Sequence, residues 1–346
     1  MQKKIKEFVK YIIILLILIL SIYFTLDDLD LVLFVEILKQ VRWEWCLFSI
    51  PVAMLSHWVR AIRWKIFLKP ITTAKSNINL FSAVMVGYVI NNIIPRGGEF
   101  VRPFVYARRE KVSKSAVFAT IIVERVIDVL FLLLMFAIAF FASRETIVNA
   151  FPWLSMEKMT YFLLLMAGSV LLLFLLITTN ISDAILRICI KPIFSKKYDK
   201  ICSIATSFRK GFEVIKTPSE YLGTFLYSAA IWALYALPMY LMFFAFDFQQ
   251  SLNLGLADAG LLIVVSGVGT SIAPTPGAIG VYHWLVVTAL VQLYPTITQE
   301  EALAYATLTH GVNLILQVIV GAGFLVRENV NKLPTKEEFE STPQQF

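Results

Sequence analysis

The sequence predicts an all-α fold, a polytopic transmembrane helical bundle made of two inverted-topology repeats that each contain a re-entrant hairpin. Three observations predict it: an apolar composition, six long apolar runs, and an uneven distribution of Lys and Arg between loops. Of the 346 residues, 58% are hydrophobic and 16% are charged, and the mean hydropathy is +0.73. Because a soluble domain carries about 25% charged residues, this composition excludes a soluble enzyme and a disordered protein.

Six apolar runs are long enough to cross the membrane, because a helix needs about 20 residues to span about 30 Å of hydrocarbon. The first run follows a basic N-terminus and has no small-residue cleavage site after it, so we expect an uncleaved span. Short amphipathic helices are expected along the interface at 28–42 and 112–123. The six predicted spans are residues 8–26, 43–59, 126–142, 160–179, 221–246 and 302–326.

The flanks of these spans predict the orientation, because cytoplasmic loops carry more Lys and Arg. The acidic loop after the first span and the loop 295–301, which has no Lys or Arg, are predicted to lie outside. Both termini are therefore expected in the cytoplasm of a multi-pass protein of the cell inner (plasma) membrane. The segments predicted to be cytoplasmic are the N-terminus and residues 60–75, 102–114, 180–219 and 327–346.

Two apolar stretches are broken by Pro and Gly and have both flanks on the same predicted side. They are expected to form hairpins, one entering from the cytoplasm at about 78–110 and one from outside at about 255–294. The short sequences GYVINNIIPRGG and GVGTSIAPTPG at their tips are weakly alike. The expected organisation is a first membrane repeat over 1–150, a second repeat over 151–330, and a cytoplasmic tail over 331–346.

Ionisable residues inside a membrane are costly, so they point to function. The first group is Arg96, Glu99 and Arg102 at the first hairpin. Arginine suits an anionic lipid headgroup, because its planar fork can hold a phosphate through two hydrogen bonds. The second group, at the start of the next span, is Glu124, Arg125 and Asp128.

The six residues are formally neutral together, and they are expected either to contact substrate or to form a charge network that ties the hairpin to a neighbouring helix. Gly98 allows a close approach, and Asn91 is expected either to bind the headgroup or to cap freed carbonyls. Arg60 and Arg63, beside Trp58 and Trp64, are expected to snorkel toward the interface, and binding an anionic lipid headgroup is the alternative.

The second hairpin tip contains no charge, and its candidate binding residues are Pro276, Gly277, Gly280 and His283. His283 is expected to be either a proton-sensitive switch or an interfacial packing residue beside Trp284. The three cysteines and three histidines show no metal-ligand spacing, and no nucleotide-binding or catalytic motif is present. No catalytic residue, metal or cofactor is therefore predicted.

At these motifs the sequence resembles the membrane region of the lysylphosphatidylglycerol synthases, a family also described as flippase-like or UPF0104-type integral membrane proteins. The resemblance covers about residues 8–326. Arg96 follows Pro95 directly, Ala278 replaces a Gly, and His283 stands where many relatives have Glu. The residues that carry the resemblance are Gly87, Asn91, Pro95, Arg96, Gly98, Glu99, Arg102, Glu124, Arg125, Asp128, Pro274, Pro276, Gly277 and Gly280.

This resemblance implies a flippase that moves an anionic (phospho)lipid between leaflets without ATP hydrolysis. The soluble aminoacyl-transfer domain of full synthases is not expected, because the chain stops about twenty residues after its last span. Two alternatives stay open, an intramembrane lipid-modifying enzyme and a non-transporting partner of a lipid synthase. The net charge of +7 is assigned to cytoplasmic loops rather than to nucleic-acid binding, and the oligomeric state is left open.

Overall fold

The computed structural model describes residues 2–27, 29–73, 76–150 and 215–329, with side chains from residue 12, and isolated positions between 157 and 191. These parts of the chain form helices and connecting turns, with no strand among them, which confirms the all-α prediction. The predicted span 160–179, most of the loop 180–219 and the tail 331–346 lie outside the described residues.

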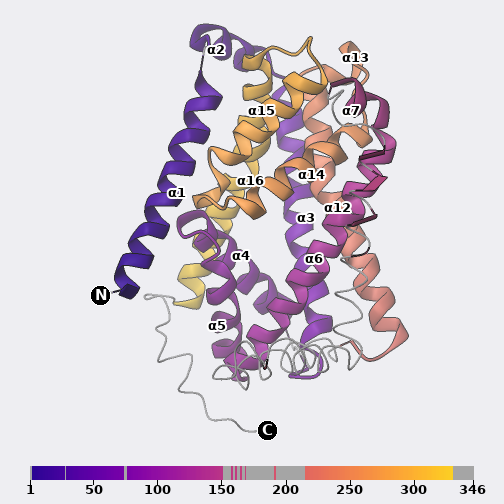
Figure 1. The fold of residues 1–346 in the computed structure, drawn as a ribbon. Coiled ribbons are helices and arrows are strands. Elements are labelled where there is room, and N and C mark those ends of the chain that lie inside the picture. Colours follow the sequence, from indigo (N-terminus) through magenta and orange to yellow (C-terminus); the bar gives the residue numbers. More distant parts are fainter. Residues whose placement is uncertain are drawn as a thin grey trace.

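The long helices run lengthwise through one bundle, and the short helices α2 and α7 turn away from the long helices that precede them (Figure 1). In chain order they are α1 (Gln2–Leu26), α2 (Leu31–Gln40), α3 (Trp43–Leu68), α4 (Asn77–Ile93), α5 (Gly98–Glu110), α6 (Lys114–Ala142), α7 (Arg144–Ala150), α12 (Pro218–Ala245), α13 (Phe248–Ser251), α14 (Leu256–Ile272), the 3-10 turn η3 (Pro276–Ala278), α15 (Val281–Leu293) and α16 (Gln299–Glu328).

By length and composition, four described helices can cross a membrane: α3, α12, α16 and the stretch Pro276–Leu293. The bent pairs α1–α2 and α6–α7, each with an 81° break, raise the number to six. The chain is therefore an integral multi-pass membrane protein. Within Pro276–Leu293 the helix is interrupted, because Gly277 has φ +58° and Gly280 has φ +79°, so α15 itself has only 13 residues.

Two of the predicted boundaries differ from the structure. Residues 112–123 were expected to lie along the interface, but α6 runs unbroken from Lys114, because no Pro or Gly interrupts it and its first turns bury Val117 and Thr120 against neighbours. The second span was expected to end at 59, but α3 continues to Leu68 and keeps Trp64 and Phe67 fully buried. The segment 28–42 does contain a separate helix, α2, which Asp30 caps at its start.

The two predicted hairpins are present as the helix pairs α4–α5 and α14–α15. In Figure 1, α4 and α5 occupy the lower half of the bundle, and α14 and α15 occupy the upper half. Each pair is surrounded by its own apolar core. One core includes Leu80, Met85 and Val101, and the other includes Leu262 and Leu290.

The two helices of the first hairpin, α4 and α5, pack very closely. A Cβ atom on Gly98 would lie 1.9 Å from the carbonyl oxygen of Gly87, so glycine is required where α4 and α5 cross. The turn between the helices places Arg96 in the left-handed region at φ +61°. In the second hairpin Ala278, which replaces a Gly of the family pattern, adopts φ +58°.

The inverted repeat itself stays a prediction, because the predicted first span of the second repeat lies outside the described residues. The ends of the described helices nevertheless sort as the charge pattern requires. In Figure 1, α2, α7 and α13 lie at the upper end of the bundle, and the end of α5 and the start of α12 lie at the lower end.

Candidate functional site

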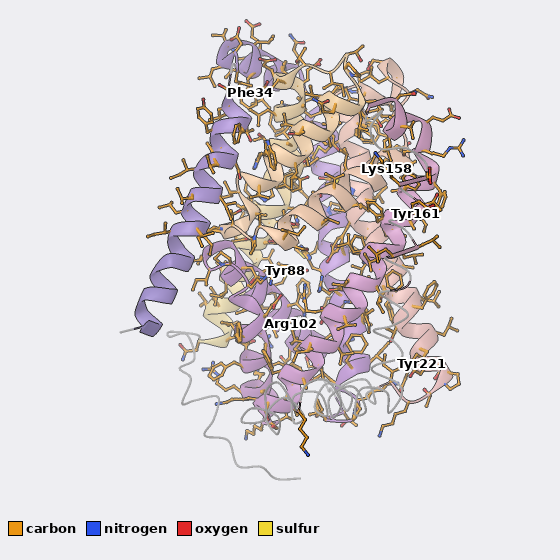
Figure 2. All side chains as sticks on the ribbon, viewed as in Figure 1. Phe34, Tyr88, Arg102, Lys158, Tyr161 and Tyr221 are labelled. Carbon is orange, nitrogen blue, oxygen red and sulfur yellow. The ribbon has the colours of Figure 1, made fainter. Side chains whose placement is uncertain are left out.

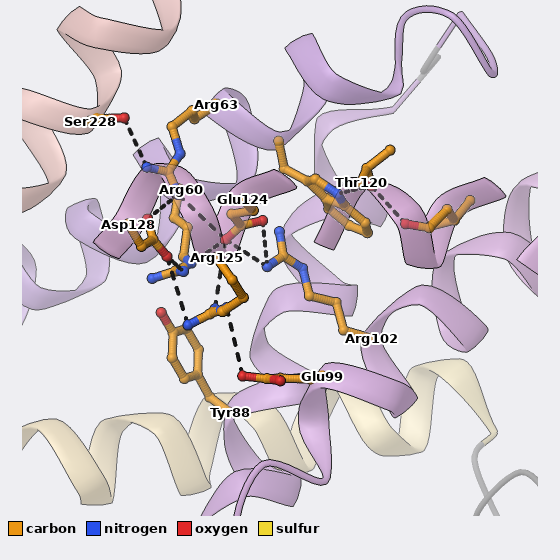
Figure 3. A network of polar contacts seen from close by, with 12 residues as sticks. Arg60, Arg63, Tyr88, Glu99, Arg102, Thr120, Glu124, Arg125, Asp128 and Ser228 are labelled. Carbon is orange, nitrogen blue, oxygen red and sulfur yellow. Dashed lines mark hydrogen bonds and ion pairs between the residues drawn. The ribbon is translucent and has the colours of Figure 1, made fainter. Parts of the chain in front are cut away.

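Four arginines and three acids meet inside the lower half of the bundle (Figure 3). We call them the arginine cluster. Its formal charge is +1, because four guanidinium groups face three carboxylates. The cluster consists of Arg60 and Arg63 on α3, Glu99 and Arg102 on α5, and Glu124, Arg125 and Asp128 on α6.

Glu124 is the centre of the cluster and is fully buried. Its Oε1 accepts a hydrogen bond from Arg60 Nε at 2.7 Å, and its Oε2 lies 2.9 Å from Arg102 Nη1. Arg63 Nη2 lies 3.5 Å from Oε1. Since a buried carboxylate is stable only when paired and hydrogen-bonded, these guanidinium groups are what keep Glu124 inside the bundle.

Asp128 lies one helical turn after Glu124 and accepts hydrogen bonds from two of the same arginines. Arg63 Nη2 donates to its Oδ1 at 2.6 Å, and Arg60 Nη2 donates to its Oδ2. Hydroxyl groups of α12 complete the two forks, because Arg60 Nη1 donates to Tyr235 at 2.8 Å and Arg63 Nη1 donates to Ser228 at 2.9 Å. These contacts join α3, α6 and α12.

Arg102 is held by an aromatic face as well as by Glu124. Its guanidinium carbon lies 3.9 Å from the ring centroid of Trp64, a cation–π contact. Trp64 is itself fixed, because its Nε1 donates a hydrogen bond to Thr120 at 2.9 Å. Figure 2 shows Arg102 within the bundle, between its two ends.

Arg125 is the exception, since 44% of its side chain is exposed. It lies 3.7 Å from Glu99, 3.7 Å from Asp128 and 3.9 Å from Glu124, which are ion-pair distances longer than a direct hydrogen bond. Glu99 is also partly exposed, at 31%. Arg125 and Glu99 therefore form the open edge of the cluster, and Arg125 keeps most of its hydrogen-bonding capacity.

The tips of the two hairpins touch near the cluster. Arg96 Nη2 donates to the carbonyl oxygen of Ser271, in the last turn of α14, at 2.6 Å. A Cβ on Gly277 would lie 3.6 Å from Asn92 Oδ1, so the second tip lies against the end of α4. The two hairpins, which are far apart in the sequence, therefore meet at their tips.

The remaining residues of the predicted site lie around these tips. Asn91 Oδ1 accepts a hydrogen bond from the amide of Gly98, the first residue of α5, at 2.8 Å. Pro276 begins η3, and Gly280 packs closely on Ser21 of α1. The ring of His283 lies 5.0 Å edge-on from that of His310, a juxtaposition that sequence spacing did not suggest.

Two expectations about the charged residues were wrong. Arg60 and Arg63 do not snorkel to the interface, because they are 6% and 0% exposed and pair with Glu124 and Asp128. Arg96 contacts Ser271 instead of joining the cluster, which removes one positive charge from the expected neutral set. Arg60 and Arg63 join the cluster, so its net formal charge is +1. The i,i+3 spacing of Arg60 and Arg63 places both on one face of α3, but it does not show that this face points into the bundle.

Among the described residues, no group of three or more His, Cys, Asp or Glu side chains could hold a metal ion. The fold and the arginine cluster together define a polytopic α-helical membrane protein with ion-paired charges buried between its helices. The chain belongs to the lysylphosphatidylglycerol synthase TM region family, whose model matches residues 10–321.

Three archaeal relatives are similar over most or much of their length, and all three are named UPF0104 membrane proteins. That of Methanocaldococcus jannaschii is 24% identical over 92% of this chain and 94% of its own. That of Pyrococcus horikoshii is 24% identical over 85% and 90%, and that of Methanothermobacter thermautotrophicus is 23% identical over 63% and 67%. No solved structure matches the chain.

Proposed function

We propose that this protein moves an anionic phospholipid between the leaflets of a cell membrane without hydrolysing ATP. The observation that carries the proposal is the uncompensated positive charge of the arginine cluster, at whose open edge Arg125 is half exposed. A lipid phosphate would complete the pairing there, because a guanidinium group can hold two phosphate oxygens at once.

In this proposal the headgroup enters between the helices and the acyl chains stay in the bilayer. Arg125 binds the phosphate, and Glu99 orients Arg125 from the facing helix α5. The paired groups behind them, Arg102 and Glu124, hold the cluster in place. In the same proposal, the headgroup passes the tips of the two hairpins, which carry Arg96, Gly98, Pro276, Gly277, Gly280 and His283.

Movement without ATP is part of the proposal, since the sequence has no Walker loop. Two broken helix pairs that touch at their tips suit alternating access, in which one half of the bundle rocks against the other around a fixed site. The cell membrane is the proposed location, and the end of the bundle that carries the Lys- and Arg-rich segments is proposed to face the cytoplasm.

The test is exchange of tail-labelled lipids between the leaflets of reconstituted vesicles. Wild-type protein should accelerate exchange of anionic lipids in the absence of ATP. Arg125→Gln should slow it by about ten- to a hundred-fold, as expected for loss of a charge-assisted hydrogen bond. Arg144→Gln is the matched control, because Arg144 is an exposed arginine of α7, just after α6, and it should exchange lipids like wild type.

Equal exchange by wild type and Arg125→Gln, for every anionic lipid tested, would contradict the proposal. Mass spectrometry of the same vesicles separates the two alternatives. A lipid-modifying enzyme would leave a lipid of new mass. A non-transporting partner would leave the lipids and their distribution unchanged.

A further inference from the structure

A second group of polar side chains lies beside the arginine cluster and carries no formal charge. We call it the amide–imidazole group, and it consists of His57 on α3, Asn92 on α4, and Asn313 and Gln317 on α16. Asn313 Oδ1 lies 3.3 Å from His57 Nε2 and 3.4 Å from Gln317 Nε2. Asn92 Nδ2 donates to Gln317 Oε1 at 3.4 Å.

Tyrosines connect this group to the arginine cluster. The ring of His57 lies 4.5 Å from that of Tyr88, which Figure 3 labels at the edge of the cluster. The hydroxyl of Tyr88 lies 3.3 Å from that of Tyr235, which accepts a hydrogen bond from Arg60. His57 is also one helical turn before Arg60 on α3, so the two groups are adjacent.

The amide–imidazole group has hydrogen-bonding capacity that its own contacts do not use. His57 is 2% exposed, yet its Nδ1 has no hydrogen-bond partner among the described residues. Asn313 Nδ2 and Asn92 Oδ1 likewise take part in none of the hydrogen bonds found in that part of the chain. The three contacts within the group are 3.3–3.4 Å long, at the weak end of the range for N–H···O bonds.

We infer that the amide–imidazole group binds free hydroxyl groups of the lipid headgroup while the arginine cluster holds its phosphate. A hydroxyl both donates and accepts, so it suits a site that offers acceptors and donors without charge. With Nε2 of His57 donating to Asn313 Oδ1, Nδ1 of His57 accepts a hydrogen bond from the hydroxyl, and Asn313 Nδ2 donates one to the hydroxyl oxygen. This inference rests on the proposed function and narrows it to anionic phospholipids whose headgroups carry hydroxyl groups.

The competing interpretation is that these side chains only hold helices together, as polar residues often do between membrane helices. That interpretation predicts no discrimination between headgroups. Two lipids distinguish the possibilities: phosphatidylglycerol and phosphatidylpropanol. They share one negative charge and a three-carbon headgroup, and they differ only in the two free hydroxyl groups.

The experiment measures leaflet exchange of both lipids, labelled on the same acyl chain, in vesicles that contain the full-length protein. Wild type should exchange phosphatidylglycerol at least about five-fold faster, as expected for one additional hydrogen bond. Asn313→Leu should bring the two rates together, because it removes the group that distinguishes the two headgroups. Thr307→Val is the matched control, because it removes a hydroxyl from α16 outside the group and should keep the wild-type preference.

The outcomes separate this inference from the proposed function. Equal exchange of both lipids by wild type, or an equal loss of both rates in Asn313→Leu, overturns the inference and leaves lipid transport standing. Failure of wild type to exchange either lipid overturns both. If Asn313→Leu does not fold, Asn92→Leu removes the acceptor on the facing helix and should abolish the same preference.

Discussion

Arg63 and Arg125 belong to the same cluster, but their removal should have different effects. Arg63 is fully buried and donates to Asp128 and Ser228, whereas Arg125 is half exposed and makes only long ion pairs. Arg63→Gln should therefore destabilise the fold by about 3–5 kcal/mol, the cost of breaking a buried ion pair. Arg125→Gln should change stability by only about 0–1 kcal/mol.

Equilibrium unfolding of both variants in mixed micelles checks this prediction. The same change of residue type at both positions makes each variant the control for the other. A loss of stability in Arg125→Gln as large as that in Arg63→Gln would mean that Arg125 is a structural residue, and its effect on transport would then say nothing about phosphate binding.

The acidic half of the cluster was easier to predict than its basic half. Glu124 and Asp128 are an i,i+4 pair inside an apolar run, and such residues are expected to face the bundle interior. Arg60 and Arg63 stand beside tryptophans near the end of an apolar run, where snorkelling is the usual behaviour. Only tertiary packing, which brings α6 against α3, shows that they are paired and buried.

At the scale of elements, the first hairpin depends on two glycines that meet across it. Gly98→Ala would place a Cβ 1.9 Å from the carbonyl oxygen of Gly87, so α4 and α5 would have to separate. We expect a loss of stability of about 1–3 kcal/mol and slower lipid exchange, because the tip would move away from Ser271.

Gly260→Ala is the control, because no atom lies within 4 Å of a Cβ built there and Gly260 is inside a helix. It should leave stability unchanged or raise it by about 0.5–1 kcal/mol. Equilibrium unfolding of Gly98→Ala and Gly260→Ala measures both changes in stability. Equal stability of the two variants would contradict the close approach of α4 and α5.

The long helices and both hairpins follow from apolar length and from Pro and Gly, which are local properties of the sequence. The residues at which the helices begin and end also depend on packing against distant parts of the chain. Residues 112–123 carry an amphipathic pattern that suits an interface, but the same pattern lets them bury Val117 and Thr120 as the first turns of α6. A short amphipathic run next to a span can therefore be read in two ways, and packing decides between them.

At the scale of the whole molecule, the charge pattern predicts which end of the bundle faces the cytoplasm. Glu36 is exposed on α2 at one end, and Arg109 is exposed on α5 at the other. In a chain whose three native cysteines are replaced, Glu36→Cys should react with an impermeant maleimide in intact cells. Arg109→Cys should react only after the membrane is opened.

Labelling of both positions, before and after the membrane is opened, makes each cysteine the control for the other. The reverse labelling pattern would show that the protein has the opposite orientation in the membrane, with the same fold. Reaction of both positions in intact cells would contradict the assignment of the two exposed residues to opposite ends of a membrane-spanning bundle.

The single excess charge of the arginine cluster has an electrical consequence for the proposed function. A bound phosphodiester carries one negative charge, so the occupied site is formally neutral and the phosphate is not an unpaired charge inside the bilayer. Because the site stays fixed while access alternates, the cluster does not cross the membrane potential but the lipid does, and each unit charge that crosses 100 mV exchanges about 2.3 kcal/mol with the field. The membrane potential therefore acts on the transported lipid, and it favours accumulation of the anionic lipid in the leaflet on the positive side.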